Sequence, residues 1–387
     1  MKEKTSIVFT GDIQLDRYMD GHWNDEQLIS EEVMAFLLSG DHLVANVEGA
    51  LIPEELATTP RKKGRFFHTM NPEAIKVLNK IKADVWCLAN NHTMDDNVQG
   101  MESGLRYAKE NGVQTIGAGM NIAEATRPAY YPEAGGIGIF AIAFMPECVR
   151  ATETEPGMFP WDDFDLIEKT IREIKKTCRY CICVAHGEIE FTTLPTPYTR
   201  DRYLKILELG ADAVIAHHPH VVMNYEMVGK KPIFYSLGNF LLDTPYQREQ
   251  PHTDRGLLIR LDFDENGISF VPFGFRIDRT DERVKPAPIP DIFENIGEED
   301  YRLLMPTSMK ALLKTERKRE SYLRPECAGW TEEQWTRYFN LTEMNGYYLP
   351  GSYRDFKVVY EEALRADEKE FESCRLEKVK AYIREYL

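Results

Sequence analysis

Long hydrophobic runs are absent from this sequence of 387 residues. The first apolar segment, residues 6–10, follows a short charged N-terminus and is far too short for the core of a signal peptide or for a membrane span. No later segment reaches the required length. We therefore expect no export signal, no membrane insertion and a cytoplasmic location.

Positive charge is also scarce. The chain has 47 Lys and Arg residues against 63 Asp and Glu residues, which gives a net charge of −16. Nucleic-acid binding requires clustered Lys and Arg, and an anionic membrane surface requires a basic patch, so the composition excludes both as main partners. One basic run, residues 61–65, either binds an anionic group of a substrate or is a solvated loop.

Cysteine is infrequent and shows no pairing pattern. The seven cysteines are scattered, apart from Cys178, Cys181 and Cys183, whose spacing invites a zinc interpretation. Residues 179–185 also have the composition of a buried strand, on which Cys181 and Cys183 would share one face. Because no second thiol pair follows at zinc-finger spacing, we expect core cysteines in a reducing compartment.

Internal repeats and low-complexity segments are absent as well, and residues 5–275 instead alternate strand-like with helix-like segments. We expect strands at residues 6–10, 42–47, 84–89, 137–144, 181–185, 213–216 and 232–236, and a hairpin of residues 257–263 and 268–275 around an Asn-Gly turn. We expect helices at residues 26–38, 72–81, 100–111, 164–176 and 198–209. This order predicts an α/β fold, in which polar groups at strand C-termini mark the ligand side of the sheet.

The composition changes after about residue 280. Pro286, Pro288 and Pro290 form a stiff segment that resembles a linker. Residues 302–318, 331–340 and 353–386 are rich in Lys, Arg and Glu and have helical apolar spacing. We expect a catalytic domain at residues 1–280 and a helical C-terminal subdomain at residues 281–387 that packs on this domain or covers it as a lid.

Five short polar clusters lie near the ends of apolar runs. They are Gly11-Asp12-Ile13-Gln14, Asn46-Val47-Glu48, Asn90-Asn91-His92, His186-Gly187-Glu188 and His217-His218-Pro219-His220. Imidazole, carboxylate and amide ligands in this mixture suit Zn, Mn, Fe or a similar divalent ion. Ligands that arrive from several strand ends are typical of a metallo-hydrolase built on a β-scaffold.

Each cluster also has a structural interpretation. Asp12 follows a strand and a glycine, and it could be a turn residue or a helix N-cap. Asn46 and Glu48 lie two apart on a strand, so they point the same way, and as a buried pair they require partners that a cation would supply. Gly187 allows another group to approach the backbone closely. The pair His218 and His220 gives the strongest indication of a metal.

The clusters form one ordered series that resembles a known family. The series is Gly11-Asp12 with Leu15-Asp16-Arg17, Ala45-Asn46-Val47-Glu48, Leu88-Ala89-Asn90-Asn91-His92 with Asp95, His186-Gly187-Glu188, Gly210-Ala211-Asp212, His217-His218-Pro219-His220-Val221 and Tyr235-Ser236-Leu237-Gly238-Asn239-Phe240. It resembles the bacterial capsule-synthesis CapA proteins, which are linked to poly-γ-glutamate and look like a branch of the calcineurin-like metallophosphoesterases. The resemblance covers roughly residues 5–275 and implies a four-layer α/β/β/α sandwich, here with a C-terminal helical extension.

The resemblance also implies roles for individual residues around one or two divalent ions, with Mn, Zn or Fe favoured. Asp12 and His220 would bind the first metal, and Glu48 would bridge to the second. The second metal would be bound by Asn91, His186 and His218. His92 would be the general acid for the leaving group. Weak ligands or supporting and substrate-contacting residues would be Gln14, Arg17, Asn46, Asn90, Asp95, Glu188, His217 and Asn239.

The sequence departs from the family pattern in three ways. Phosphoesterases begin with Asp-x-His, whereas this chain has Gln14 in place of the histidine, so we expect the first metal to bind more weakly than the second. Gly187 follows His186 without the tryptophan that is common in CapA proteins. The family is often extracytoplasmic, whereas this sequence predicts no export signal.

Two functional hypotheses follow. In the first, the protein is a CapA-like metal-dependent hydrolase that cleaves a phosphoester or a γ-glutamyl-type bond with a metal-activated water, on a small molecule or an anionic polymer. In the second, it is a non-catalytic assembly or binding factor that keeps the metallophosphatase fold. In either case the C-terminal helices could join two copies into a homo-oligomer.

Overall fold

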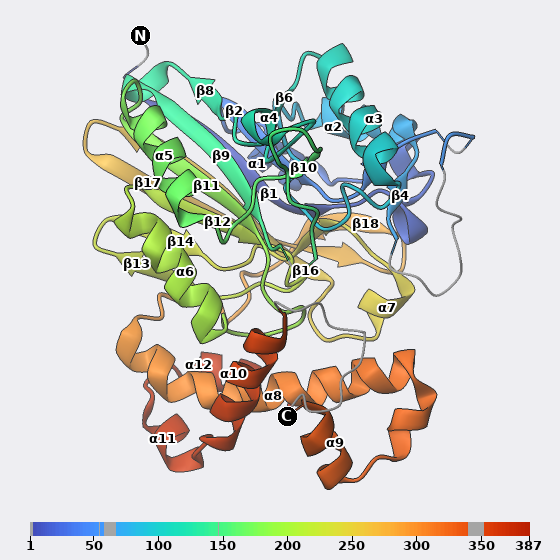
Figure 1. Ribbon diagram of the computed structural model, residues 1–387, viewed down its shortest axis with the longest axis vertical. Coiled ribbons are helices and arrows are strands. Elements are labelled where there is room, and N and C mark those ends of the chain that lie inside the picture. The colour runs from blue at the N-terminus through green and yellow to red at the C-terminus, as the bar shows by residue number, and fades with distance from the viewer. Residues whose placement is uncertain (1–2, 54, 58–66, 146, 340–351) are drawn as a thin grey trace.

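The computed structural model describes residues 3–53, 55–57, 67–145, 147–339 and 352–387. The basic run at residues 61–65 lies outside the described residues. Two β-sheets pack face to face, and helices cover their outer faces (Figure 1). This architecture confirms the expected four-layer α/β/β/α sandwich.

The first sheet has eight strands. Its order is β18 (Arg283–Pro286), β17 (Gly267–Asp278), β16 (Arg255–Asp264), β1 (Thr5–Ile13), β2 (His42–Val47), β5 (Val85–Cys87) and β6 (Gln114–Ile116), with β15 (Asn239–Leu241) also paired with β1. Strands β1, β2, β5 and β6 are parallel, whereas β16, β17 and β18 form an antiparallel extension. The parallel core therefore brings the C-terminal ends of β1, β2 and β5 to one edge.

The second sheet has six strands. Its order is β13 (Tyr225–Val228), β14 (Lys231–Phe234), β12 (Ala213–His217), β11 (Tyr180–His186), β9 (Ile137–Ala143) and β8 (Ala129–Tyr131). The four central strands are parallel, and the two outer strands are antiparallel to their neighbours. Two short strand pairs, β3 (Ala50–Leu51) with β4 (Thr69–Met70) and β7 (Ala118–Gly119) with β10 (Gly157–Met158), lie outside the two sheets.

Side-chain alternation along β11 separates the two cores of the sandwich. Ile182 and Val184 belong to the large core between the sheets, whereas Cys181 and Cys183 pack in a second core under the helices. This is the period of two that a strand buried on both faces requires. All cysteines are free, and Cys178, Cys181 and Cys183 are buried, which agrees with core cysteines.

Amphipathic helices cover the outer faces of both sheets. Helices α5 (Phe164–Lys175) and α6 (Pro197–Glu208) bury apolar residues on the second sheet, and Figure 1 shows them on the opposite side of the molecule from α2 (Ile75–Lys80) and α3 (Asn97–Glu110). The layer of α2 and α3 also contains α1 (Glu31–Leu37). Two short helices, α4 (Ile122–Ala125) and α7 (Pro245–Arg248), lie in connecting segments.

The C-terminal helices pack against one end of the sandwich, below the strands in Figure 1. They are α8 (Glu298–Leu323), α9 (Glu332–Phe339), α10 (Ser352–Leu364), α11 (Glu368–Ser373) and α12 (Glu377–Arg384). The expected boundary at residue 280 stays a prediction, although β18 follows this residue and still belongs to the first sheet. None of the described helices is both long enough and apolar enough to cross a membrane.

Two expected helices are wrong in extent. Residues 26–30 are not helical, because Ser30 caps α1 by accepting a hydrogen bond from the backbone of Val33, and Ile29 forms a bridge to Val284 of β18. The expected helix at 353–386 is three helices, and α11 begins where the Asp367 side chain accepts hydrogen bonds from two backbone amides.

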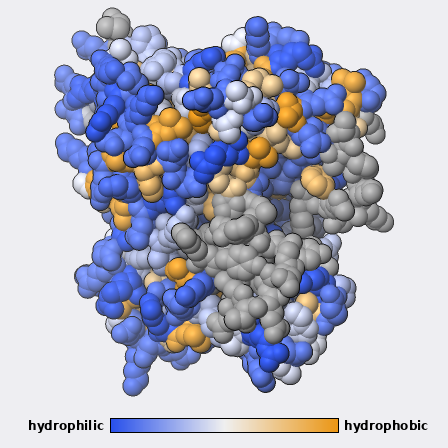
Figure 2. Space-filling view, viewed as in Figure 1, coloured by the Kyte–Doolittle hydropathy of each residue, from blue (hydrophilic) through white to orange (hydrophobic). Residues whose placement is uncertain are grey.

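The molecular surface agrees with the high charge of the chain: the face in Figure 2 is mostly hydrophilic, with hydrophobic residues in small groups.

Candidate metal centre

The polar clusters meet because they occupy equivalent positions at the ends of parallel strands. Asp12 of β1 is in register with Asn46 of β2 and with Asn239 of β15. On the second sheet, His186 of β11 is in register with His217 of β12. The packed sheets bring these two strand edges together, and Asn46 Nδ2 lies 3.4 Å from His186 Nδ1.

Two groups of side chains in this centre have the spacing of metal ligands. The first contains Asp12, Glu48 and His220, and the second contains Glu48, His186 and His218. Within each group the three candidate ligand atoms lie within 4.8 Å of one another, and every residue is buried. Glu48 belongs to both groups, as a bridging ligand would.

The donor set fits bound cations. Both carboxylate oxygens of Glu48 are buried without a hydrogen-bond partner among the described residues, whereas Oδ2 of Asp12 lies 3.3 Å from His220 Nδ1 and Nε2 of His218 lies 3.1 Å from a Glu147 oxygen. Burying such groups without partners is unfavourable by several kcal/mol, and coordination of a cation would satisfy them. Imidazole and carboxylate ligands suit Zn, Mn or Fe.

The pKa values of the two acidic groups are shifted in opposite directions. Burial raises the pKa of Glu48 to about 7, and the Asp12 charge adds to this shift. Burial also opposes ionisation of Asp12, but hydrogen bonds from His217 and His220 outweigh it and hold the pKa of Asp12 well below its usual range. Asp12 is therefore the permanent anion of the first group.

The loop after β12 has a strained backbone. His218 has a φ of 99° and His220 a φ of 58°, both in the left-handed region that residues with a side chain seldom adopt. Each such residue costs on the order of 1–3 kcal/mol, and the cost is tolerated where the surrounding structure fixes it, often at functional sites. This conformation directs both imidazoles toward Glu48.

His92 lies beside the centre and is oriented by a carboxylate. Its Nδ1 is 2.7 Å from Oδ2 of Asp95, and its Nε2 is 3.9 Å from Oε1 of Glu48. Burial lowers the pKa of His92, but the Asp95 charge and hydrogen bond outweigh burial and raise it to about 9. The side chain is thus held close to the candidate ligands with a defined orientation.

Four of the other predicted residues contact the ligands directly. Asn91 Oδ1 lies 2.9 Å from His186 Nε2, next to the second group. Asn239 Oδ1 lies 2.9 Å from His220 Nδ1, and His217 Nδ1 lies 3.1 Å from Asp12 Oδ1. Asn46 Nδ2 donates to the same Asp12 oxygen at 2.8 Å.

Gln14 is turned toward a polar network next to the first group. Its Nε2 donates to Oδ1 of Asp16 at 2.8 Å, and the other Asp16 oxygen is 3.2 Å from His68 Nδ1. The His68 ring packs edge-on against His92, with 4.3 Å between centroids. The Oε1 atom of Gln14 is buried with no hydrogen-bond partner among the described residues.

Three further predicted site residues bond to the backbone or to a helix cap near the centre. Asn90 organises the loop after β5 through Val47 and the His92 backbone. Glu188 accepts hydrogen bonds from the backbone amide and the hydroxyl of Thr196, the residue that caps α6. Arg17 donates to the carbonyl of Phe67, beside His68. A side chain at Gly187 would collide with the Trp161 ring, at 2.8 Å from its Cζ3, so this glycine permits packing.

Several residues near the centre have no strand-end signal in the sequence. His68 comes from a loop, Glu147 lies 3.1 Å from His218 Nε2, and Glu190 is close enough to His218 and His220 for their charges to lower its pKa. A polar cluster directly after an apolar strand is the signal that marks the other site residues. His68 directly precedes β4, and Glu147 and Glu190 follow the ends of β9 and β11 outside such a cluster.

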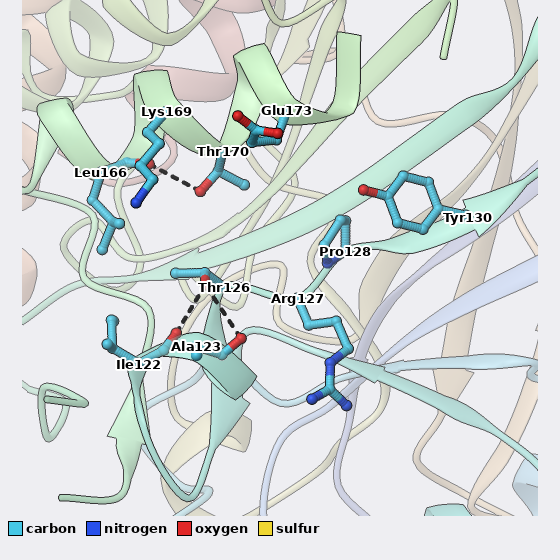
Figure 3. Close-up of a pocket in the computed structure, with 10 residues that line it drawn as sticks. All are labelled: Ile122, Ala123, Thr126, Arg127, Pro128, Tyr130, Leu166, Lys169, Thr170 and Glu173. Carbon is cyan, nitrogen blue, oxygen red and sulfur yellow. Dashed lines mark hydrogen bonds between the residues drawn. The ribbon is translucent and has the colours of Figure 1, made fainter. Parts of the chain in front are cut away.

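A surface pocket of about 360 Å³ lies elsewhere, between α4 and α5 (Figure 3). Its lining includes Ile122, Arg127, Tyr130 and Lys169, and it contains none of the candidate metal ligands. It is therefore separate from the metal centre.

Comparisons with known proteins identify relatives of this chain. The chain is 28% identical over 292 residues to the "PGA biosynthesis protein CapA" of Bacillus subtilis (strain 168), covering 73% of each chain. It is 24% identical over 278 residues to the "Capsule biosynthesis protein CapA" of Bacillus anthracis, covering 70% of this chain and 66% of the relative. It is also 24% identical over 188 residues to a "Probable polyglutamine synthesis accessory protein" of Mycobacterium tuberculosis, covering 46% of this chain and 50% of the relative.

Solved structures give weaker likenesses. A 5'-nucleotidase from Candida albicans SC5314 matches with a TM-score of 0.40 and 11% identity, covering 70% of this chain and 51% of that chain. The TT1561 protein of Thermus thermophilus matches with a TM-score of 0.39 and 11% identity, covering 69% of this chain and 98% of that chain.

The family model described as "Bacterial capsule synthesis protein PGA_cap" matches residues 6–244, which include every candidate metal ligand. The chain belongs to this family of bacterial capsule synthesis proteins.

Proposed function

We propose that the protein is a metal-dependent hydrolase that acts in the metabolism of a capsule-type or poly-γ-glutamate polymer. One observation carries the proposal: two groups of buried ligands share Glu48, whose carboxylate oxygens accept no hydrogen bond from the described residues and would be satisfied by cations. When bound there, divalent metals supply Lewis acidity and lower the pKa of a coordinated water. Residues of this chain supply the remaining functions.

His92 is the proposed general acid. Asp95 holds its Nδ1, which leaves Nε2 directed toward Glu48 and toward the space where a leaving group would lie. Protonation of a leaving oxygen or nitrogen by a positioned imidazole accelerates hydrolysis by roughly 10²–10⁴-fold. Asn91, whose Nδ2 is 3.0 Å from His92 Nε2, limits the rotation of the ring.

The bond cleaved is a phosphoester or a γ-glutamyl-type amide. The likeness to CapA proteins supports a polymer substrate, and the ligand set supports either reaction. A metal-loaded protein prepared without chelators should hydrolyse one member of a panel containing an aryl phosphate, a phosphodiester and γ-glutamyl oligomers. Glu48→Gln should lose metal and turnover together, whereas Glu110→Gln, on the exposed face of α3, should retain both.

A second candidate function is supported by the word "accessory" in the name of the mycobacterial relative. In that case the centre would bind metal and a polymer or protein partner without turnover. Full metal occupancy with no cleavage of any substrate in the panel would favour this assembly role and contradict the hydrolase.

A further inference from the structure

The C-terminal helix α8 reaches the rim of the metal centre through one arginine. Arg319 Nη1 lies 3.7 Å from Oε2 of Glu190, in the loop that follows β11. Glu190 in turn lies in the electrostatic range of His92, His218 and His220, at the rim of the centre. Helix α8 lies outside residues 6–244, the segment that matches the family.

Apolar side chains form a wall beside this arginine. Phe191 lies 6.1 Å from His220 and 5.6 Å from Tyr246 between ring centroids. Tyr246 packs on Tyr322 of α8 at 5.6 Å and lies near Glu190 and Arg319. The wall therefore continues from the metal centre to α8, on the side where Arg319 is located.

Burial opposes the ionisation of one of the two carboxylates beside Arg319. Glu316, one turn earlier on α8, lies 3.7 Å from Arg319 and is completely buried, and neither of its carboxylate oxygens has a hydrogen-bond partner among the described residues. Burial raises the pKa of Glu316 to about 7.

Several contacts besides Arg319 dock α8 on the sandwich. The Tyr301 hydroxyl donates to the carbonyl of Pro195 at 2.7 Å, and Ser308 bonds Thr193 at 2.6 Å. Arg200 of α6 also binds Glu298 at 2.6 Å. Helix α8 therefore has anchors other than Arg319, whose guanidinium lies at the rim of the centre beside Glu190.

We propose that α8 completes the substrate site and that Arg319 binds an anionic oxygen group, a carboxylate or a phosphate, on the part of the substrate next to the scissile bond. The inference takes its substrate class from the proposed function, but it concerns the binding of the substrate and not its cleavage. The planar guanidinium matches both oxyanions in a bidentate geometry. Glu190 orients Arg319 toward the centre, and the Phe191–Tyr246 wall excludes water from the contact.

Binding of two probes to the metal-loaded protein tests the proposal by calorimetry. Glutarate represents the carboxylate source, and inorganic phosphate represents the phosphate source. Arg319→Met should weaken the affinity for the probe that the wild-type protein prefers by about 10- to 100-fold, because a charge-assisted hydrogen-bonded contact is lost. The control is Arg317→Met, which removes an arginine of the same helix that pairs with Glu332 at 2.7 Å, and it should bind as wild type does.

Metal content and melting temperature distinguish binding from anchoring. Weaker probe binding by Arg319→Met at unchanged metal content and melting temperature supports the proposal. Should Arg319→Met unfold, Arg319→Lys keeps the charge but loses the planar fork, and weaker probe binding by this folded variant supports it equally. Wild-type affinity for both probes in either folded variant overturns it.

The substrate panel separates this inference from the proposed hydrolase. If a substrate is cleaved, Arg319→Met should raise KM with little change in kcat. If nothing is cleaved, the hydrolase proposal fails, and the two calorimetric probes still decide whether Arg319 binds an anion.

Discussion

At the scale of single residues, the centre relies on side chains whose polar atoms have few partners other than a cation. Glu48 is completely buried, belongs to both ligand groups and accepts no hydrogen bond from the described residues. His92, by contrast, has contacts to Asp95 and Asn91 at both ring nitrogens. This difference separates a residue suited to bind metal from a residue suited to act on substrate.

We expect His92→Ala to lower turnover by about 10²–10⁴-fold and to keep metal content near wild type, because the ligand groups do not include His92. His218→Ala should lose metal instead. Elemental analysis and steady-state kinetics on substrates with good and poor leaving groups check this, since a good leaving group needs little protonation. A His92→Ala protein stripped of metal would contradict the assignment.

We expect Gln14→His to raise metal occupancy at the first position. The amide is a weak neutral ligand, and Gln14 directs its Nε2 to Asp16, whereas an imidazole would add a strong ligand next to Asp12. Titration with Mn or Zn, followed by elemental analysis, measures the change. Unaltered occupancy in a folded variant would show that position 14 does not face the first metal.

At the scale of elements, β1 and the start of β15 approach each other so closely that there is no room for a side chain at Gly11. A Cβ at this position would lie 2.1 Å from the carbonyl oxygen of Gly238. We expect Gly11→Ala to reduce stability by about 1–3 kcal/mol, the usual cost of overpacking, and to weaken metal binding through Asp12.

Gly104→Ala is the matched control for this substitution. Gly104 lies within α3, and a Cβ there would have no heavy atom within 4 Å. This change should stabilise the protein by about 0.5–1 kcal/mol because alanine favours the helix. Denaturant unfolding measures both variants, and equal effects of the two substitutions would refute the close approach of β1 and β15.

The starts of β2 and β5 are joined by an ion pair that depends on pH. His42 Nδ1 lies 2.8 Å from Asp84 Oδ2, and Glu133 and Asp41 also face the imidazole. Burial lowers the pKa of His42, but the Asp84 hydrogen bond and charge outweigh it and raise the pKa above 6.5. Because the folded pKa is raised, the stabilisation is complete below pH 6.5 and is lost as the pH rises through the folded value.

Substitution of His42 tests this linkage. We expect His42→Gln to lose more unfolding free energy at about pH 5.5 than at about pH 8.5, on either side of the histidine pKa. Urea unfolding at the two pH values measures the difference. A loss that is the same at both values would mean that His42 contributes by packing on Tyr131, whose ring is 3.9 Å away, and not by charge.

At the scale of the whole molecule, local patterns predict the sandwich and the polar strand ends but not the contacts between distant segments. The strands and the C-terminal helices follow from periodicity, and the convergence of Asp12 with His220 follows from their placement at strand ends together with the family resemblance. Residues 26–30 have helical spacing, yet they begin as a turn and then pair with Val284 of β18 through residues 28–30. Glu190 and Arg319 lie far apart in the sequence, and only the packing of α8 brings them together.

The last prediction concerns the C-terminal helices as a unit. Helix α8 buries Tyr301, Leu304 and Leu312, and α12 lies against the segment that precedes β16, where Tyr382 stacks on His252. A chain that ends at residue 297 keeps β18 and the backbone bonds of residues 294–296 to Tyr225, but it leaves this apolar surface in water.

We therefore expect the shortened chain to aggregate or to melt at a lower temperature than the full chain, and co-expression of residues 298–387 should restore it. Soluble yield and thermal unfolding measure both effects. Because the candidate metal ligands all precede residue 297, any soluble fraction should still bind metal while losing affinity for anionic probes, since Arg319 is gone. A shortened protein as stable and as active as the full chain would show that these helices neither support the sandwich nor complete its site.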